Sequence, residues 1–424
     1  MKDDRKSIIS WAMYDWANSA FATTVMAGFF PLFFKAYWAN QANVTESTFF
    51  LGLANSLASI IVAAFSPFLG AIADKGTAKK RFLLFFAYLG ILSTGGLWFI
   101  AQGMWHFAAL LYVAGAIGFQ GGNIFYDALL VGIASKKKVD FVSSLGFALG
   151  YIGGGLLFLV NVLMYQMPQI FGIPDATIAI KLSFVTVALW WAVFSIPVFL
   201  FVKEPPIDNS VPFRHAIKAG YRQLIGTLKE IRHMKVVGLF LLAYWFYIDG
   251  VDTIIRMAVD YGTSLGFDSS ALIIALLIVQ FVAFPGALLY NFYSSKVGIK
   301  KGIFTAIFAY CIITVLGFFM QNVTHFFILA MTVGMFQGGI QALSRSCFAR
   351  IIPEQKAGEF YGFFNMLGKF AAVIGPILMG SVAYFTGSSR LSILSIMILF
   401  FIGAFFFSKV DLKEGEKMAK EYLS

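Results

Sequence analysis

The fold is decided by Trp11-Ala-Met-Tyr-Asp-Trp-Ala-Asn-Ser-Ala-Phe21, a stretch that places polar side chains inside a long apolar run. Asp15, Asn18 and Ser19 are three and four residues apart, so they share one face of a helix. A carboxylate in such a segment is costly, and it usually faces the interior of a helix bundle or a water-filled cavity. The stretch therefore predicts a membrane helix with one polar, functional face.

A second copy of this pattern begins 234 residues later, in Trp245-Phe-Tyr-Ile-Asp-Gly-Val-Asp-Thr-Ile-Ile255. In it, Asp249 takes the place of Asp15, and Asp252 takes the place of Asn18. A polar-faced membrane helix that occurs once in each half predicts a chain built from two related halves, as in secondary transporters with internal repeats.

The composition is that of an integral membrane protein. Hydrophobic residues make up 59% of the 424 residues and charged residues only 12%, and the mean hydropathy is +0.80. Soluble globular chains carry about 25% charged residues. Runs of about 20 apolar residues cross a bilayer as helices, whereas a membrane barrel needs short alternating strands. We therefore expect an all-α membrane protein.

Twelve apolar runs are visible, and one long polar interruption divides them into two sets of six. We expect an N-terminal six-helix half at residues 1–202, a cytoplasmic linker at 203–235, and a C-terminal six-helix half with a short tail at 236–424. Phe119-Gln-Gly-Gly122 recurs as Phe336-Gln-Gly-Gly339, which supports pseudo-symmetry between the halves. The runs lie at roughly 8–38, 48–73, 82–103, 106–135, 141–165, 179–202, 236–262, 270–294, 302–321, 325–352, 357–385 and 390–408.

The linker contains an amphipathic pattern, in which apolar residues recur every three or four positions and basic residues stand between them. This pattern is typical of a helix lying on the inner leaflet. A tether between the halves is the simplest role, and a regulatory or partner-binding role is the alternative. The apolar positions are Phe213, Ile217, Tyr221, Leu224, Leu228 and Ile231, and the basic ones are Arg214, Lys218, Arg222, Lys229 and Arg232.

The net charge of +11 reports membrane topology rather than a nucleic-acid partner. If the N-terminus is cytoplasmic, 26 of the 32 basic residues fall in inside segments, while the outside segments hold Lys35, Lys181 and Arg390. This asymmetry is the positive-inside rule. It predicts that both termini are cytoplasmic.

The segment after the second run, Gly70-Ala-Ile-Ala-Asp-Lys-Gly-Thr-Ala-Lys-Lys-Arg81, resembles the signature loop of the major facilitator superfamily, with one spacer residue missing. An Asp at the membrane edge can pair with basic groups or with a helix N-terminus across the seam between the halves. The second copy, at residues 291–301, has Ser295 in place of the carboxylate, so we expect the electrostatic part of the latch in the first half. The resemblance implies a gate that latches the outward-facing state, made by Gly70, Asp74, Lys75, Gly76, Lys79, Lys80 and Arg81.

Four stretches spread over most of the chain carry a narrower resemblance: Tyr14 to Phe21, Gly146 to Gly154, Tyr247 to Thr253 and Gln337 to Ser346. Together they resemble the vacuole-effluxer-like branch of that superfamily. This branch is named for a fungal vacuolar amino-acid exporter linked to autophagy, and it has many bacterial members. The resemblance implies export of amino acids or similar solutes and, for a bacterial member, a place in the inner membrane. Asp127 stands after Tyr126 where an uncharged residue such as Asn is expected, and this extra acid implies proton coupling or a different substrate.

The superfamily fold implies that the first, fourth, seventh and tenth helices line a central cavity, and polar residues gather in those runs. Asp and Arg groups on facing halves are expected to hold opposite ends of a zwitterion. Lys369, in the eleventh run, needs a carboxylate or a substrate anion. Asp127 and, after it, Asp249 are the candidates for proton coupling. The expected binding residues are Asp15, Asn18, Gln120, Asn123, Tyr126, Asp127, Asp249, Asp252, Arg256, Gln337, Gln341, Arg345 and Lys369.

Each of these charges also has a purely structural interpretation. Asp252 and Arg256 are one helical turn apart and form a salt bridge in that interpretation, while Asp15 is a cap or gate partner. The stretch Gly150-Tyr-Ile-Gly-Gly-Gly155 resembles the exporter motif of superfamily antiporters, with Tyr151 in place of Pro, but close helix packing explains its glycines equally.

Other classes of protein are excluded by what the sequence lacks. It contains no Walker motif and no soluble domain, which argues against an ATP-driven pump. No nucleophile–base pattern indicates an enzyme, and the positions of the four His indicate no metal site or cofactor. We expect a monomeric secondary transporter, surrounded by membrane lipids, that moves a small polar or zwitterionic solute by alternating access. The alternatives are an exporter of larger amphipathic compounds such as drugs or lipids and, further away, an uncoupled lipid scramblase or a receptor.

Overall fold

The computed structural model describes residues 2–40, 44–76, 78–204 and 234–421. Every regular element in these residues is a helix, which confirms the all-α prediction. The amphipathic helix expected in the linker lies outside the described residues.

Twelve helical segments of the described chain are long and apolar enough to cross a membrane, in agreement with the twelve predicted runs. The first begins with α1 (Arg5–Ala20) and continues to Trp38 through η1 (Phe21–Phe29), α2 (Phe30–Phe33) and η2 (Phe34–Trp38), of which η1 and η2 are π-helical. The others in the first half are α3 (Val44–Gly76), α4 (Lys79–Gly96), α5 (Trp105–Ile133), α6 (Val139–Gln166) and α7 (Ala176–Phe201). The second half contains α9 (Lys235–Ser264), α10 (Ser269–Val297), α11 (Ile299–Phe318), α12 (Val323–Ile351), α13 (Ala357–Thr386), and the pair α14 (Ser389–Ser395) and α15 (Met397–Ser408). A tail helix, α16 (Leu412–Glu421), follows.

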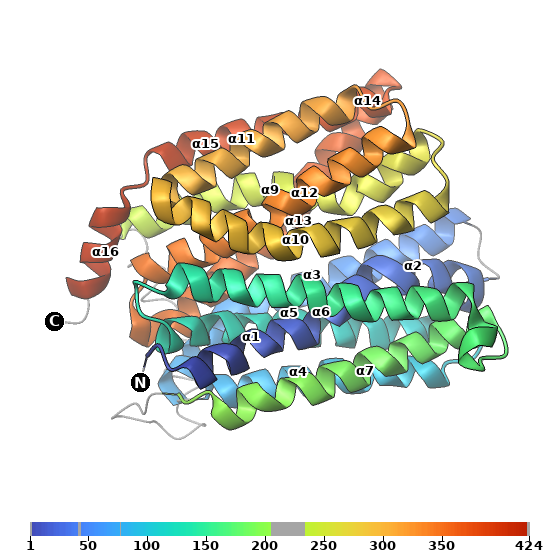
Figure 1. The fold of residues 1–424 in the computed structure, drawn as a ribbon, viewed down its shortest axis with the longest axis horizontal. Helices are drawn as coiled ribbons and strands as arrows, with labels where there is room; N and C mark the ends of the chain where they lie inside the picture. Colours follow the sequence, from blue (N-terminus) through green and yellow to red (C-terminus); the bar gives the residue numbers. More distant parts are fainter. Residues whose placement is uncertain (1, 41–43, 77, 205–233, 422–424) are drawn as a thin grey trace.

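The helices form two six-helix halves that lie side by side (Figure 1). Both described ends of the chain lie at the same end of the bundle, which we call the termini end (Figure 1). Across the seam, α3 packs against α13 and α6 packs against α10. Each half therefore contributes helices to a shared central interface.

The same capping device occurs once in each half. Lys80, at the start of α4, donates to two carbonyl oxygens at the end of α7, each at 2.7 Å. Lys300, at the start of α11, donates to two carbonyl oxygens at the end of α15 and just after it, at 2.8 and 2.6 Å. Carbonyl groups at a helix C-terminus lack intrahelical partners and carry partial negative charge, so a lysine stabilises them. Lys80 thus joins two helices of one half.

Glycines allow α6 to lie directly on α1. A Cβ atom at Gly150 would lie 2.7 Å from Ser19 Oγ, and one at Gly154 would lie 2.7 Å from Thr23 Oγ1. Small residues permit such close approach of membrane helices. This packing sets the polar face of α1 beside α6 at the centre of the bundle.

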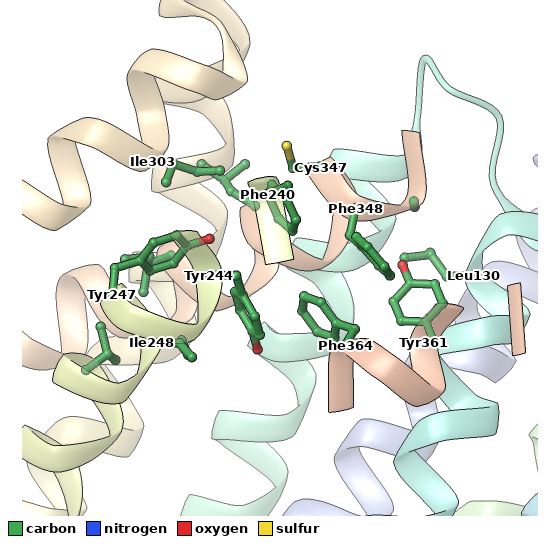
Figure 2. Packing of buried hydrophobic residues seen from close by; sticks show 14 of the residues in the cluster. Leu130, Phe240, Tyr244, Tyr247, Ile248, Ile303, Cys347, Phe348, Tyr361 and Phe364 are labelled. Carbon is green, nitrogen blue, oxygen red and sulfur yellow. The ribbon is translucent and has the colours of Figure 1, made fainter. Parts of the chain in front are cut away.

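Aromatic side chains pack the second half where α12 ends and α13 begins, near the termini end. Figure 2 shows this packing from close by. Tyr244 stacks on Phe364 with ring centroids 4.1 Å apart, and Phe348 stacks on Phe364 at 5.0 Å. Leu130 of α5 and Tyr361 of α13 belong to the same buried cluster, and Figure 2 shows them next to each other. Apolar packing therefore continues across the seam at this end.

Candidate functional site

A cavity of about 450 Å³ lies between the two halves. Its walls come mainly from α1, α5, α6, α9, α10, α12 and α13. Aromatic and aliphatic side chains make up most of the wall, with a small number of polar groups among them, as is usual for ligand sites. Ten of the predicted binding residues line it: Asp15, Asn18, Asn123, Tyr126, Asp127, Asp252, Gln337, Gln341, Arg345 and Lys369.

Arg345 of α12 lies between two carboxylates of the other half. Its Nη1 is 3.1 Å from Asp127 Oδ1 and 3.4 Å from Asp15 Oδ2. The Arg345 side chain is 3% exposed, and the carboxylates are 9% and 13% exposed. We call Asp15, Asp127 and Arg345 the Arg345 cluster. It is a buried ion-pair group that joins the halves.

The cluster forms the floor of the cavity on the side of the termini end. Along α12, which begins at the opposite end with Val323, the lining extends from Phe326 to Arg345. The cavity therefore extends from the Arg345 cluster toward the end of the bundle that lies away from the termini.

Neutral groups around the cluster fix its geometry. Arg345 donates from Nε to Ser143 Oγ at 2.9 Å and from Nη2 to the Ser143 carbonyl at 2.8 Å. Tyr126 donates its hydroxyl to Asp15 at 2.7 Å, and Asn365 of α13 donates to Asp127 at 3.1 Å. A buried ion pair is stable only when such additional hydrogen bonds satisfy its remaining atoms.

The cluster carries an excess negative charge when both acids are ionised, because two carboxylates share one guanidinium. A proton or a substrate ammonium group can neutralise this excess. In the described part of the chain no three His, Cys, Asp or Glu side chains are grouped as metal ligands. The charged side chains of the site pair with one another, and its carboxylates accept hydrogen bonds from neutral groups.

Amide and hydroxyl groups line the wall beside the cluster. Asn18 donates to Asn123 Oδ1 at 2.8 Å within the first half. Tyr151 of α6 donates to Gln341 Oε1 of α12 at 2.6 Å and so connects the halves. These groups can exchange their mutual hydrogen bonds for bonds to a polar solute.

Lys369 and Asp252 place opposite charges on another part of the lining. Lys369 belongs to α13 and Asp252 to α9, and each acts electrostatically on the other. The described ion pairs include neither side chain. Both charges are therefore available to a solute in the cavity.

Three predicted binding residues lie outside the cavity lining. Asp249 is fully buried against α13, Gln120 is buried within the first half, and Arg256 is exposed. The described ion pairs do not include the expected pair of Asp252 with Arg256. Side chains on one face of a helix point in a similar direction, but those at the two edges of the face contact different neighbouring helices.

Four side chains that contact the site were not predicted: Ser143, Phe147, Tyr151 and Asn365. The ring of Phe147 lies 4.1 Å from the Arg345 guanidinium carbon, a cation–π contact. Asn365 stands four residues before Lys369, so helical spacing from that predicted residue was the signal for it. Ser143 and Phe147 carry no comparable sequence signal.

At the termini end, the carboxylate of Asp74 binds the N-terminus of α13 across the seam. Its oxygens accept hydrogen bonds from the backbone N–H groups of Gly358 and Glu359 at 3.0 and 2.9 Å. Lys79 Nζ lies 2.8 Å from the same carboxylate. A negative charge is favourable at a helix N-terminus, where N–H groups lack partners. A Cβ at Gly70 would overlap the Gly358 backbone, so the two helices touch here.

The remaining predicted gating residues lie around this contact. Lys75 and Gly76 form the end of α3, and Arg81 is exposed on α4. A second cross-seam pair lies nearby, between Arg350 Nη2 and Asp140 Oδ2 at 2.6 Å. The described termini end is therefore closed by hydrogen bonds and ion pairs as well as by apolar packing.

Asp3 also anchors the N-terminal segment at this end. Its Oδ1 accepts a hydrogen bond from the backbone N–H of Ser135 at 2.9 Å, and this bond lowers the pKa of the Asp3 carboxyl. The segment before α1 is thereby attached to the loop between α5 and α6.

Comparison with known families gives matches over nearly the whole chain. A family model described as "Vacuole effluxer Atg22 like" matches residues 40–140 and 133–420. A protein of Bacillus subtilis, described as the uncharacterized MFS-type transporter YxiO, is 42% identical over 405 residues, which are 95% of this chain and 94% of that protein. Autophagy-related protein 22 of Yarrowia lipolytica is 25% identical over 440 residues, covering 83% of this chain and 73% of its own.

Solved structures share the fold at low sequence identity. The human organic anion transporter MFSD10 (TETRAN) has a TM-score of 0.75 at 14% identity, covering 96% of this chain and 100% of its own. The proton:xylose symporter XylE has a TM-score of 0.71 at 14% identity, with 97% of both chains covered. FucP in its outward conformation has a TM-score of 0.64 at 14% identity, covering 96% of this chain and 100% of its own. The architecture is thus that of the major facilitator superfamily.

Proposed function

Because the chain belongs to the vacuole effluxer Atg22-like family of major facilitator transporters, we propose that it moves a small zwitterionic solute, such as an amino acid, by alternating access. Transporters of this superfamily are not enzymes, and the chain is an integral membrane protein. What the family and the fold leave open is the solute, the direction and the coupling.

The arrangement of charge in the cavity carries the proposal. The Arg345 cluster forms the floor with an excess of carboxylate, and Lys369 adds a cation on another wall. An amino acid presents an ammonium and a carboxylate a few bonds apart, so it can neutralise the cluster and Lys369 at the same time. Desolvating both of its charges is favourable only where both are met.

Export is the direction we propose, from the cytoplasm of a bacterium across its inner membrane. The positive-inside rule puts the termini end on the cytoplasmic side, so the described state is closed to the cytoplasm. In this state the solute leaves toward the outside and the cluster closes behind it. The name of the family model and the bacterial source of the 42% identical relative support this direction and location.

Solute release follows from competition for Arg345. In the described state Asp15 and Asp127 occupy the guanidinium, which weakens its hold on a substrate carboxylate. Separation of the halves at the termini end breaks these pairs, because Arg345 belongs to one half and both acids to the other. The freed acids then bind the ammonium group of a zwitterion from the cytoplasm, and the freed Arg345 binds its carboxylate together with Lys369. Asp127 carries the excess charge that a coupling proton neutralises.

A second candidate function is export of larger amphipathic anions. The mostly apolar wall favours it, and the structural relative MFSD10 is described as an organic anion transporter. In that function Lys369 binds the anion and no ammonium is required.

Ligand-dependent thermal stabilisation of the detergent-purified protein tests the proposal. A ligand that binds the folded state raises the melting temperature by mass action. We expect stabilisation by one class of amino acids from a panel that also contains peptides, nucleosides, sugars and lipids. Lys369→Met should abolish the shift, whereas Lys181→Met should keep it, because Lys181 lies outside the cavity lining.

Two outcomes would contradict the zwitterion site. Stabilisation only by lipids or hydrophobic anions favours the second candidate function. An amino-acid shift that survives Lys369→Met places the carboxylate-binding group elsewhere.

A further inference from the structure

Asp249 is a buried acid that the proposed transport site does not use. Its side chain, on α9, is 0% exposed and lies outside the cavity lining. Its Oδ1 accepts hydrogen bonds from the backbone N–H of Gly375 at 3.0 Å and from Thr253 Oγ1 at 3.2 Å. Its Oδ2 has no hydrogen-bond partner among the described atoms. An ionised carboxylate that accepts hydrogen bonds at only one of its two oxygens has an unfavourable free energy in a buried contact between helices.

The charges on the helices around Asp249 do not neutralise it. Asp252, on the same helix, acts on it with charge of the same sign. From α13, the nearest basic group is Lys369, which lines the cavity six residues before Gly375. From α12, Arg345 is paired in its own cluster. The segment Met397–Ser408 of α15 has no titratable side chain, and the basic residues of α10 and α16 lie at the termini end.

A hard metal cation does not fit the groups at this position. Such ions take about six to eight oxygen ligands. The described structure offers the free oxygen of Asp249 and the hydroxyl of Thr253, and no group of three candidate ligands occurs in the described residues. A proton needs only one carboxylate oxygen.

Asp249 binds α13 at a point where a proline interrupts the backbone hydrogen bonds of that helix. Pro376 follows Gly375 directly, and a proline inside a helix removes one backbone hydrogen bond. A Cβ on Gly375 would collide with Thr253 Oγ1, so α9 and α13 are in contact here. The part of α13 before this point carries Asn365, which holds Asp127, and begins at the N-terminus held by Asp74. A bend at Gly375 therefore affects contacts with the first half.

We propose that Asp249 is a proton-binding site, separate from the Arg345 cluster, whose protonation state controls the bend of α13 at Gly375-Pro376. The neutral acid fits the dry contact between α9 and α13. When the O–H bond of the Asp249 carboxyl group breaks, the proton passes to water in the cavity. Asp252, one turn away on α9, lines the cavity at this point. The carboxylate left behind has no counter-charge, which favours a state in which α13 moves away and water reaches it. The proposal rests on the proposed transport function, to which it adds a second proton site beside the one proposed at Asp127.

Infrared difference spectroscopy of the reconstituted protein tests proton binding without any substrate. At neutral pH we expect a carbonyl band of a protonated carboxyl group that disappears in Asp249→Asn and persists in Asp252→Asn. In Thr253→Val, which keeps the acid but removes one hydrogen bond, the band should shift. A spectrum of Asp249→Asn identical to that of the wild type would overturn the proposal.

Transport in proteoliposomes tests coupling. The probe is a mixture of radiolabelled L-amino acids, measured once in exchange and once as accumulation driven by a pH gradient. Asp249→Asn should keep exchange within about twofold of the wild type and lose about tenfold or more of the gradient-driven accumulation, because exchange needs no net proton movement. Unchanged accumulation in Asp249→Asn would refute the coupling role. If the wild type exchanges no amino acid, the proposed function fails, while the infrared result still decides whether Asp249 binds the proton.

Discussion

Arg345 has more partners than an anion-binding residue needs. It pairs with two acids, donates to both oxygens of Ser143, and lies against the ring of Phe147. In this state protein groups bind the Arg345 side chain on all sides, so a carboxylate of a solute has to displace them in order to bind it. In the proposed function the same residue closes the seam in one state and binds the solute in the other, which would couple binding to the movement of the halves.

Substitutions of the cation and of one acid in the cluster should differ in their effect on stability. Arg345→Ala leaves two buried carboxylates without a cation and should destabilise the protein by about 3–5 kcal/mol. Asp127→Asn removes the excess charge while the pair of Asp15 with Arg345 remains, so it should be neutral or stabilising. Denaturant unfolding in detergent measures both variants, with Lys181→Met as a control outside the cluster. Equal destabilisation by the two changes would show that the charge balance of the cluster is unimportant.

At the scale of helices, periodicity predicted which face of each element is polar, but it did not predict what lies opposite. The spacing in α9 correctly grouped Asp249 and Asp252 on one side. The structure separates their surroundings, because Asp252 meets the cavity and Asp249 meets the backbone of α13. Asn365 stands one helical turn before the predicted Lys369, but this spacing alone does not show which residue it contacts. Its importance depends on the position of Asp127 on another helix, which only the packing reveals.

The contact between α3 and α13 gives a prediction at this scale. Gly70→Ala adds a methyl group where the Gly358 backbone already lies, whereas Gly52 of the same helix has nothing within 4 Å of its Cβ position. Replacing a helical Gly by Ala is by itself stabilising by about 0.5–1 kcal/mol. Gly52→Ala should therefore keep or raise stability and transport rate. Gly70→Ala should loosen the latch and slow exchange in proteoliposomes. Equal behaviour of the two variants would argue that α3 and α13 do not need to meet closely.

For the whole molecule, the two halves are held shut at one end while the cavity extends toward the other. Much of this was accessible from the sequence, because the repeat of the first helix indicated two halves, while the cytoplasmic side of the termini stays a prediction from the distribution of basic residues. The sequence did not predict that the termini end is the closed one in this structure. Closure depends on pairs between residues such as Asp140 and Arg350 that are far apart in the chain. Such cross-seam pairs have no local sequence pattern.

Reversing one of these charges should shift the balance between states. In Asp140→Lys a second cation faces Arg350, so repulsion replaces the pair now at 2.6 Å. A change of about 1–3 kcal/mol corresponds to a roughly 5–150-fold shift in the equilibrium. The measurement is labelling of a cysteine placed at Val139, which is 3% exposed here, by an impermeant reagent applied from the side of the termini. Labelling should be slow in the parent Val139→Cys protein and faster by about tenfold or more after Asp140→Lys. Glu421→Lys, which makes the same charge change in the tail helix, should leave the labelling slow. Equal labelling in all three proteins would show that the Asp140–Arg350 pair does not hold this end closed.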